Sequence, residues 1–150
     1  MLSSDQIDQI TTDSINSLIP SLRLGVRGWV EDMKARGVFP YIYCGFRSEE
    51  KQAELYAKYQ AGGPLAAPPG HSYHEAGCAV DWVPVKPMSG NPGFFEADWD
   101  NSVSYKIGER VASAHGLTPI SVETGHLQDV RYSTVEEAKS AYEQVFWSMG

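Results

Sequence analysis

Apolar residues recur at helical spacing along several stretches of the chain. The clearest stretch follows Pro20, a residue suited to the first turn of a helix, and stops at Gly37, a common helix terminator. Its apolar positions are Leu22, Val26, Trp29, Val30 and Met33. Their spacing of i, i+4, i+7, i+8 and i+11 predicts one helix with a single buried face.

Other stretches carry shorter versions of the same pattern. Residues 4–18 predict one or two short helices, and residues 103–116 predict another. Ser48 has the side chain of a helix N-cap and is followed directly by two acidic residues, which favour the positive end of a helix. Ser133 and Glu136 have the spacing of a capping box and predict the start of the last helix.

Strand patterns lie between these helices. Aromatic and β-branched residues dominate 39–45, and an apolar run covers 77–85, so each predicts a strand. Residues 117–130 predict two short strands joined by a turn at Thr124 and Gly125. Segments 61–70 and 86–100 are rich in proline and glycine and predict loops. This order predicts one α+β domain over residues 1–150, with a small, largely antiparallel sheet packed by helices.

Composition argues against some classes of function. The chain of 150 residues has a net charge of -7 and a pI of about 5.0, which argues against nucleic-acid binding. No run approaches the roughly 20 apolar residues that a membrane-spanning helix needs. The first residues are acidic and resemble no secretory signal, so we expect synthesis in the cytoplasm. Two cysteines, Cys44 and Cys78, are too few for a disulfide scaffold, although one bridge between neighbouring strands is possible.

Four histidines are present, and two of them have informative neighbours. A loop leads into His74, and Asp81 follows inside an otherwise apolar strand. A buried carboxylate is costly unless it is paired or binds a metal. Further along, Glu123 precedes His126 by three residues, and a turn between them would aim both at one point. Two histidines and one aspartate as ligands, with a glutamate as general base, meet the needs of a catalytic zinc.

Residues 72–81, Ser-Tyr-His-Glu-Ala-Gly-Cys-Ala-Val-Asp, resemble the Ser-x-His-x-x-Gly-x-Ala-x-Asp signature of the zinc D-alanyl-D-alanine peptidases. Glu123 and His126 are similar to the family's Glu-x-x-His, and residues 45–48 resemble its Gly-Tyr-Arg-Ser segment. The family includes cell-wall carboxypeptidases, vancomycin-resistance dipeptidases and phage L-alanyl-D-glutamate endolysins. The resemblance implies the Hedgehog/D-Ala-D-Ala peptidase fold, and nothing in the chain is left over for a separate wall-binding domain.

The resemblance also implies roles for individual residues. His74, Asp81 and His126 would bind Zn2+, and Glu123 would take a proton from the attacking water and pass it to the leaving amine. Arg47 would hold a substrate carboxylate or stabilise the oxyanion. The further substrate-binding candidates are Gln52, Ser72 and Tyr73.

Two features bear on the substrate subclass. Glu123 is typical of the carboxypeptidases and dipeptidases, whereas phage endopeptidases often have aspartate there; many relatives have tryptophan or proline where this chain has Gly125. The implied partner is the peptide stem of bacterial peptidoglycan, cut by a monomeric enzyme. We expect an endolysin-type endopeptidase that reaches the wall through a holin-type pore. The alternatives are a D-alanyl-D-alanine carboxypeptidase or dipeptidase and, from another class, a zinc-containing binding module without catalysis.

Overall fold

The computed structural model describes the backbone of residues 1–149 and the side chains of residues 1–146. Its strands are β1 (Leu2–Ser3), β2 (Pro40–Cys44), β3 (Ala79–Pro87), β4 (Phe94–Ala97), β5 (Leu117–Ile120) and β6 (Glu123–Asp129). Its helices are α1 (Ser4–Asn16), α2 (Pro20–Ala35), α3 (Glu49–Gln60), α4 (Ser102–Ala112) and α5 (Val135–Met149). Two short 3-10 turns, Tyr73–Ala76 and Ser113–His115, complete the described elements. The predicted α+β class is confirmed.

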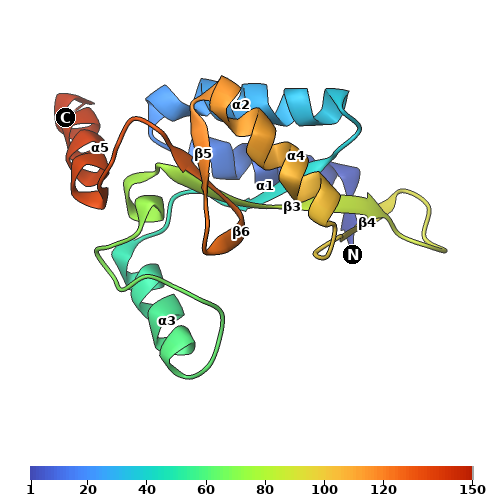
Figure 1. Ribbon diagram of the computed structural model, residues 1–150, viewed down its shortest axis with the longest axis horizontal. Coiled ribbons are helices and arrows are strands. Elements are labelled where there is room, and N and C mark those ends of the chain that lie inside the picture. Colours follow the sequence, from blue (N-terminus) through green and yellow to red (C-terminus); the bar gives the residue numbers. More distant parts are fainter. Residues whose placement is uncertain (150) are drawn as a thin grey trace.

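Every strand pairing in the described sheet is antiparallel, as expected. The strands follow the order β1-β4-β3-β6-β5, and β2 pairs with the other edge of the long strand β3. The first part of β3 therefore lies between β2 and β6, while its last residues pair with β4. Helices α2 and α4 lie over one side of this sheet, and α3 with its following loop projects from the opposite side (Figure 1).

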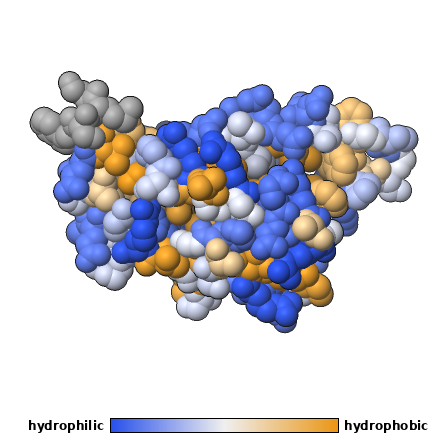
Figure 2. Space-filling view, turned by 90° about the horizontal axis from the view of Figure 1, so that it is seen from above, coloured by the Kyte–Doolittle hydropathy of each residue, from blue (hydrophilic) through white to orange (hydrophobic). Residues whose placement is uncertain are grey.

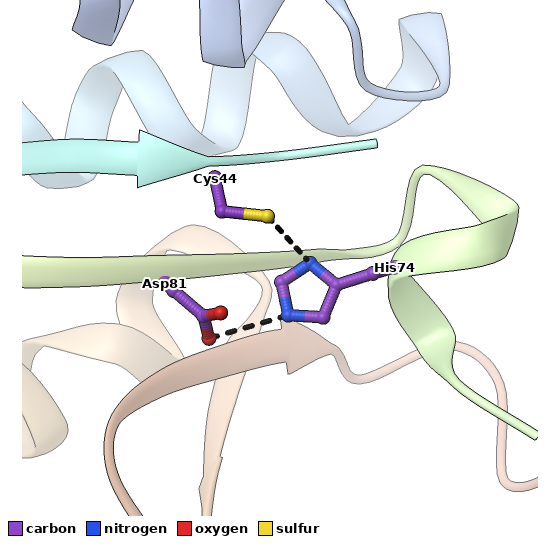
Figure 3. Close-up of side chains that lie close together, drawn as sticks. All are labelled: Cys44, His74 and Asp81. Carbon is purple, nitrogen blue, oxygen red and sulfur yellow. Dashed lines mark hydrogen bonds and ion pairs between the residues drawn. The ribbon is translucent and has the colours of Figure 1, made fainter. Parts of the chain in front are cut away.

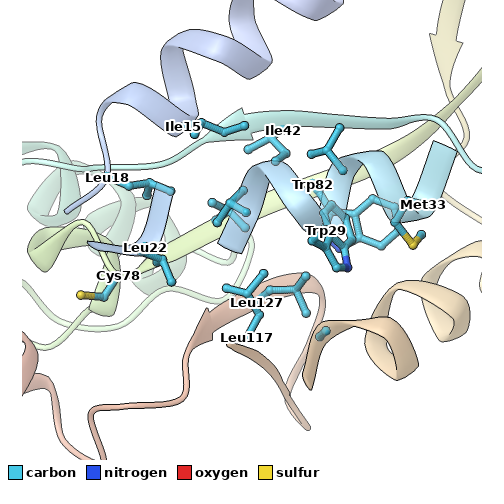
Figure 4. Close-up of a cluster of buried hydrophobic side chains, with 14 of the residues drawn as sticks. Ile15, Leu18, Leu22, Trp29, Met33, Ile42, Cys78, Trp82, Leu117 and Leu127 are labelled. Carbon is cyan, nitrogen blue, oxygen red and sulfur yellow. The ribbon is translucent and has the colours of Figure 1, made fainter. Parts of the chain in front are cut away.

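The hydrophobic core lies between the sheet and the helices above it (Figure 4). Two tryptophans form its centre: Trp29 of α2 and Trp82 of β3 meet edge to face, with ring centroids 4.9 Å apart. The indole N–H of Trp29 donates to the carbonyl oxygen of Gly108 in α4, at 3.1 Å. The apolar face predicted for α2 is fully buried here, so the helical periodicity of that stretch identified core residues correctly.

The structure corrects three local predictions. Strand β4 lies within the segment 86–100 that was predicted to be a loop, because its backbone pairs with both β1 and β3. The turn between β5 and β6 falls at residues 121–122, so Thr124 and Gly125 lie inside β6. The cap of α5 is Thr134, whose hydroxyl accepts from the N–H of Glu137, while the Glu137 side chain accepts from the N–H of Ser133, so these bonds replace the predicted capping box of Ser133 and Glu136.

Seen from above, the outer face of the helices is mainly hydrophilic, with apolar side chains in separate spots (Figure 2). Isolated apolar side chains of this kind, such as Leu24 and Val103, are ordinary for a protein surface. None of the described helices is both long and apolar enough to cross a membrane. Both cysteines are free thiols, so the possible bridge between Cys44 and Cys78 is absent.

Candidate metal centre

Asp81 is at the centre of the site because β3 runs between β2 and β6. Its backbone is in register with His126 on one side and with Cys44 on the other. Successive side chains of a strand point to opposite faces, so Val80 and Trp82 enter the core while Asp81 faces away from it. The carboxylate oxygen Oδ1 lies 3.2 Å from Nε2 of His74 and 3.3 Å from Nδ1 of His126.

His74 enters the site from the short turn before β3. The hydroxyl of Ser72 accepts from the backbone N–H of His74, and Glu75 reaches back to the N–H of Ser72, which fixes this turn. Nδ1 of His74 lies 2.7 Å from the carbonyl oxygen of Gly45. A carbonyl can only accept, so Nδ1 carries a proton and Nε2 is the ring nitrogen that points toward Asp81.

A bulge in β6 brings Glu123 and His126 to the same side. Residues three apart in a regular strand face opposite ways, but Ile120 pairs with Glu123 whereas Pro119 pairs with Leu127. Gly125 breaks the alternation with a φ of 79°, and a Cβ there would lie 2.5 Å from the carbonyl oxygen of Trp82. As a result, Oε2 of Glu123 lies 3.8 Å from Nδ1 of His126. Sequence reasoning placed both side chains together, although it attributed this to a turn.

The donor set fits a bound cation. Nε2 of His74 is buried and has no hydrogen-bond partner; its 3.2 Å approach to Asp81 is an ion-pair distance without hydrogen-bond geometry. An orphaned buried nitrogen is costly unless it has a ligand. The amide oxygen of Gln128 lies 2.9 Å from Nε2 of His126, which leaves Nδ1 of that ring for a metal. Two imidazoles and one carboxylate suit zinc.

Cys44 offers a competing donor set. Its sulfur, with His74 and Asp81, forms a group whose ligand atoms lie within 4.8 Å of one another. Figure 3 shows, however, that Cys44 approaches the Nδ1 side of the His74 ring and Asp81 the Nε2 side. Because Nδ1 is already bonded to Gly45, an ion at Nε2 lies on the side of Asp81 and away from the sulfur. The geometry therefore favours His74, Asp81 and His126, and Cys44 is a neighbour that no residue pattern placed at this site.

Charge at the site is concentrated on Asp81. Burial on its own raises the pKa of this carboxyl, but its close contacts with His126 and His74 hold the pKa of Asp81 well below its usual range. Burial lowers the pKa of His74, and the contacts with Asp81 and Cys44 outweigh this effect and raise it to about 9. In the absence of a cation, the carboxylate thus favours a proton on His74, so a metal ion must compete with that proton for Nε2 of His74.

The site opens into a cavity of about 590 Å³, one wall of which is formed by α3 and the loop after it. Its lining includes all the candidates from the sequence: Arg47, Gln52, Ser72, Tyr73, His74, Asp81, Glu123 and His126. The Ser72 hydroxyl accepts from a backbone N–H, and the hydroxyl of Tyr73 donates to the carbonyl of Tyr132. Their contact with substrate therefore stays a prediction.

The other two histidines of the chain lie in different places. His71 lines the cavity, whereas His115 lies elsewhere and forms an ion pair with Asp32 at 2.9 Å. Trp82 belongs to the core and is 1% exposed, but Trp99 is 58% exposed and contacts Tyr43 at the cavity. Sequence reasoning missed Gln128 and Tyr43, since only the strand pairing shows that their side chains reach this cavity.

The family model described as VanY, D-alanyl-D-alanine carboxypeptidase, matches residues 17–118, more than half of the chain. The chain belongs to this family. The VanY match includes His74 and Asp81 and ends before Glu123 and His126, whose assignment rests on the geometry above. VanY-family members are peptidases, so the predicted enzyme class is confirmed. No curated protein matches the chain.

Solved structures share the fold at lower identity. A vancomycin-resistance D,D-pentapeptidase VanY solved with Zn(II) is 24% identical, with a TM-score of 0.54, covering 85% of this chain and 79% of that one. The LD-carboxypeptidase LdcB is 22% identical, with a TM-score of 0.56 and coverages of 85% and 71%. The L-Ala D-Glu endopeptidase ChiX of Serratia marcescens is 19% identical, with a TM-score of 0.51 and coverages of 87% and 90%. These three enzymes are named for different bonds, so the fold does not select the bond.

Proposed function

We propose that this VanY-family peptidase uses zinc bound by His74, Asp81 and His126 to hydrolyse an amide bond in the peptide stem of bacterial peptidoglycan. The observation that carries the proposal is the convergence of both imidazoles on one oxygen of Asp81, with Glu123 beside them in a single cavity. When bound, zinc supplies a Lewis acid that lowers the pKa of a water molecule and polarises the scissile carbonyl.

The protein's own residues supply the remaining steps. The Gly45 carbonyl holds Nδ1 of His74, and the Gln128 side chain holds Nε2 of His126. In each ring, the second nitrogen therefore faces Asp81. The carboxylate of Glu123 is 39% exposed, so it is accessible to water and substrate. We propose that it accepts a proton from the attacking water and donates it to the leaving amine. A metal of purely structural function would need no such base, which argues against the binding-module alternative.

The terminal D-alanyl-D-alanine bond is the first candidate for the scissile bond. The VanY family match supports it, and so does the glutamate at position 123. The L-alanyl-D-glutamate bond expected from the sequence is the second candidate, since a peptidase with that specificity shares the fold. Release through a holin-type pore applies to this second candidate and stays a prediction, as does the monomeric state.

Digestion of purified peptidoglycan, followed by mass spectrometry of the fragments, distinguishes these candidates. Release of D-alanine alone supports a carboxypeptidase, and cleavage after L-alanine supports an endopeptidase. Glu123→Gln should bind zinc normally and lose at least about 100-fold in rate, the usual contribution of general-base catalysis. Glu109→Gln, an exposed position on α4, is the matched control and should keep full activity. No cleavage by the zinc-loaded protein would refute the proposed substrate.

Metal analysis of single variants tests the ligand set. His74→Ala, Asp81→Ala and His126→Ala should each lose the stoichiometric zinc, because a site with two protein ligands is weak. Cys44→Ser should keep it, since the thiol lies on the other side of the His74 ring. Loss of zinc from Cys44→Ser, with retention in His126→Ala, would show that the competing donor set is the real one.

A further inference from the structure

A chain of hydrogen bonds joins the metal centre to the wall of the cavity. Nη2 of Arg47 lies 3.1 Å from Oδ2 of Asp81, the oxygen that faces away from the two histidines. Nη1 of the same guanidinium donates to the amide oxygen of Gln52 at 2.8 Å. The amide nitrogen of Gln52 in turn donates to the carbonyl oxygen of Ala67, also at 2.8 Å. Ala67 belongs to the loop after α3 that lines the cavity.

Burial of these side chains limits the orientations that they can adopt. Gln52 is 1% exposed, and both ends of its amide are occupied, so it has no free polar group for a substrate. The side chains of Arg47 and Asp81 are 13% and 16% exposed. A guanidinium is planar, so a bond at Nη1 fixes the direction in which Nη2 points. Gln52 thereby determines where Arg47 meets Asp81.

The orientation of Asp81 matters because its two oxygens have different partners. Oδ1 faces both histidines, and Oδ2 faces Arg47. Without Arg47 in place, the carboxylate can rotate about its terminal bond, whose torsion is broad. A partial rotation would turn Oδ1 away from the point where His74 and His126 converge.

We propose that Gln52 is a positioning residue: through Arg47 it holds Asp81 in the orientation that binds the metal, and through Ala67 it anchors the cavity wall to the same network. The identity of the metal rests on the proposed function, but the positioning itself does not depend on which bond is cut. Groups that orient metal ligands in this way commonly change metal affinity by roughly 10- to 100-fold when they are removed.

Zinc affinity, measured by competition with a chromophoric chelator, tests the proposal without measuring activity. Gln52→Met removes both hydrogen bonds and should weaken zinc binding roughly 10- to 100-fold. Gln52→Glu keeps an acceptor for Arg47 and loses the donor to Ala67, so its zinc affinity should stay within about 3-fold of the wild type. Gln60→Met, at an exposed position at the end of the same helix, is the control and should leave zinc affinity unchanged.

A second measurement separates positioning from damage to the fold. The visible spectrum of the cobalt-substituted protein reports ligand geometry; it should change in Gln52→Met and match the wild type in Gln52→Glu. Circular dichroism of the metal-free variants checks folding. If Gln52→Met does not fold, Arg47→Lys replaces it: a single ammonium cannot reproduce the planar fork, so the same loss of zinc affinity is expected.

Two results would overturn the inference. One is wild-type zinc affinity in a folded Gln52→Met protein, and the other is equal loss in Gln52→Met and Gln52→Glu. Failure to digest peptidoglycan, combined with the expected zinc affinities, would refute the proposed function and leave the positioning role intact.

Discussion

Gly108 allows α4 to lie directly on the tryptophan pair of the core. A Cβ at this position would lie 2.5 Å from Cζ2 of Trp82 and 3.2 Å from Cζ2 of Trp29. Both indoles are at most 1% exposed, so neither can move aside into solvent. Replacement of a helical glycine by alanine ordinarily stabilises a helix by about 1 kcal/mol. Overpacking of a close-packed core typically costs about 1–3 kcal/mol, and displacement of α4 would also strain the bond from Trp29 to the Gly108 carbonyl.

We therefore expect Gly108→Ala to destabilise the protein by about 1–2 kcal/mol, against its helix propensity. In a domain of this size that corresponds to a fall in Tm of roughly 2–8 °C. Urea denaturation of the metal-free protein, with m-values compared between variants, gives the free energy of unfolding directly. The destabilisation by Gly108→Ala should be absent when the Trp82 ring atoms that oppose the new methyl group are removed.

A double-mutant cycle with Trp82→Phe provides that check. Phenylalanine lacks the ring atoms that meet the new methyl group, so in the Trp82→Phe background Gly108→Ala should be neutral or stabilising by up to about 1 kcal/mol. The coupling energy between the two positions should then be at least about 1 kcal/mol. Equal destabilisation in both backgrounds would refute the steric argument, and so would stabilisation by Gly108→Ala alone.

Other predictions concern the metal and two ionisable groups. With free zinc at about 1,000 times its dissociation constant, chelation should lower the free energy of unfolding by about 4 kcal/mol. The Tm measured by calorimetry should then fall by roughly 8–16 °C. An unchanged Tm would exclude a metal site specific to the folded state. Burial raises the pKa of Cys78 to about 12, so iodoacetamide at pH 8 should leave this thiol unlabelled in the native protein, and rapid labelling detected by mass spectrometry would contradict its burial. The hydrogen bond with His115 is the largest cause that lowers the pKa of Asp32 below its ordinary 3.8. The pair thus stabilises the fold above that pH, and the contribution is lost as the pH falls through the lowered pKa. His115→Ala should move the pKa of Asp32, measured by NMR titration, toward 3.8. An unchanged pKa would show that His115 does not lower it.

Much of the fold follows from local patterns in the sequence. Helical spacing of apolar residues identified α2 because its buried face continues over three turns. Ser48 could be identified from the sequence as a helix cap because capping is a local interaction. Its hydroxyl accepts from the N–H of Lys51, only three residues away. Strand β4 escaped prediction because its pairing with β1 joins segments about 90 residues apart, and proline and glycine surround it in the sequence.

The candidate site was also predictable only in part from the sequence. The sequence indicated His74, Asp81, Glu123 and His126, and the structure brings these four side chains together. Their common orientation depends on a bulge, which a residue pattern alone does not specify. Gln52 resembled a substrate contact in the sequence, but its buried bonds to Arg47 and Ala67 arise only when α3 folds against its own loop.

The bulge at Gly125 also has a consequence for how this enzyme can vary. Position 125 needs both a left-handed backbone and the absence of a side chain, since any Cβ would meet the Trp82 carbonyl at 2.5 Å. Its neighbours Val122 and Thr124 are exposed. In a saturation library screened for folding, position 125 should therefore accept only glycine, whereas the exposed positions 122 and 124 should accept many residues. The exposed residues of the surrounding turn can then change without altering the spacing of Glu123 and His126, so the rim of the cavity can diversify while the candidate metal ligands keep their positions.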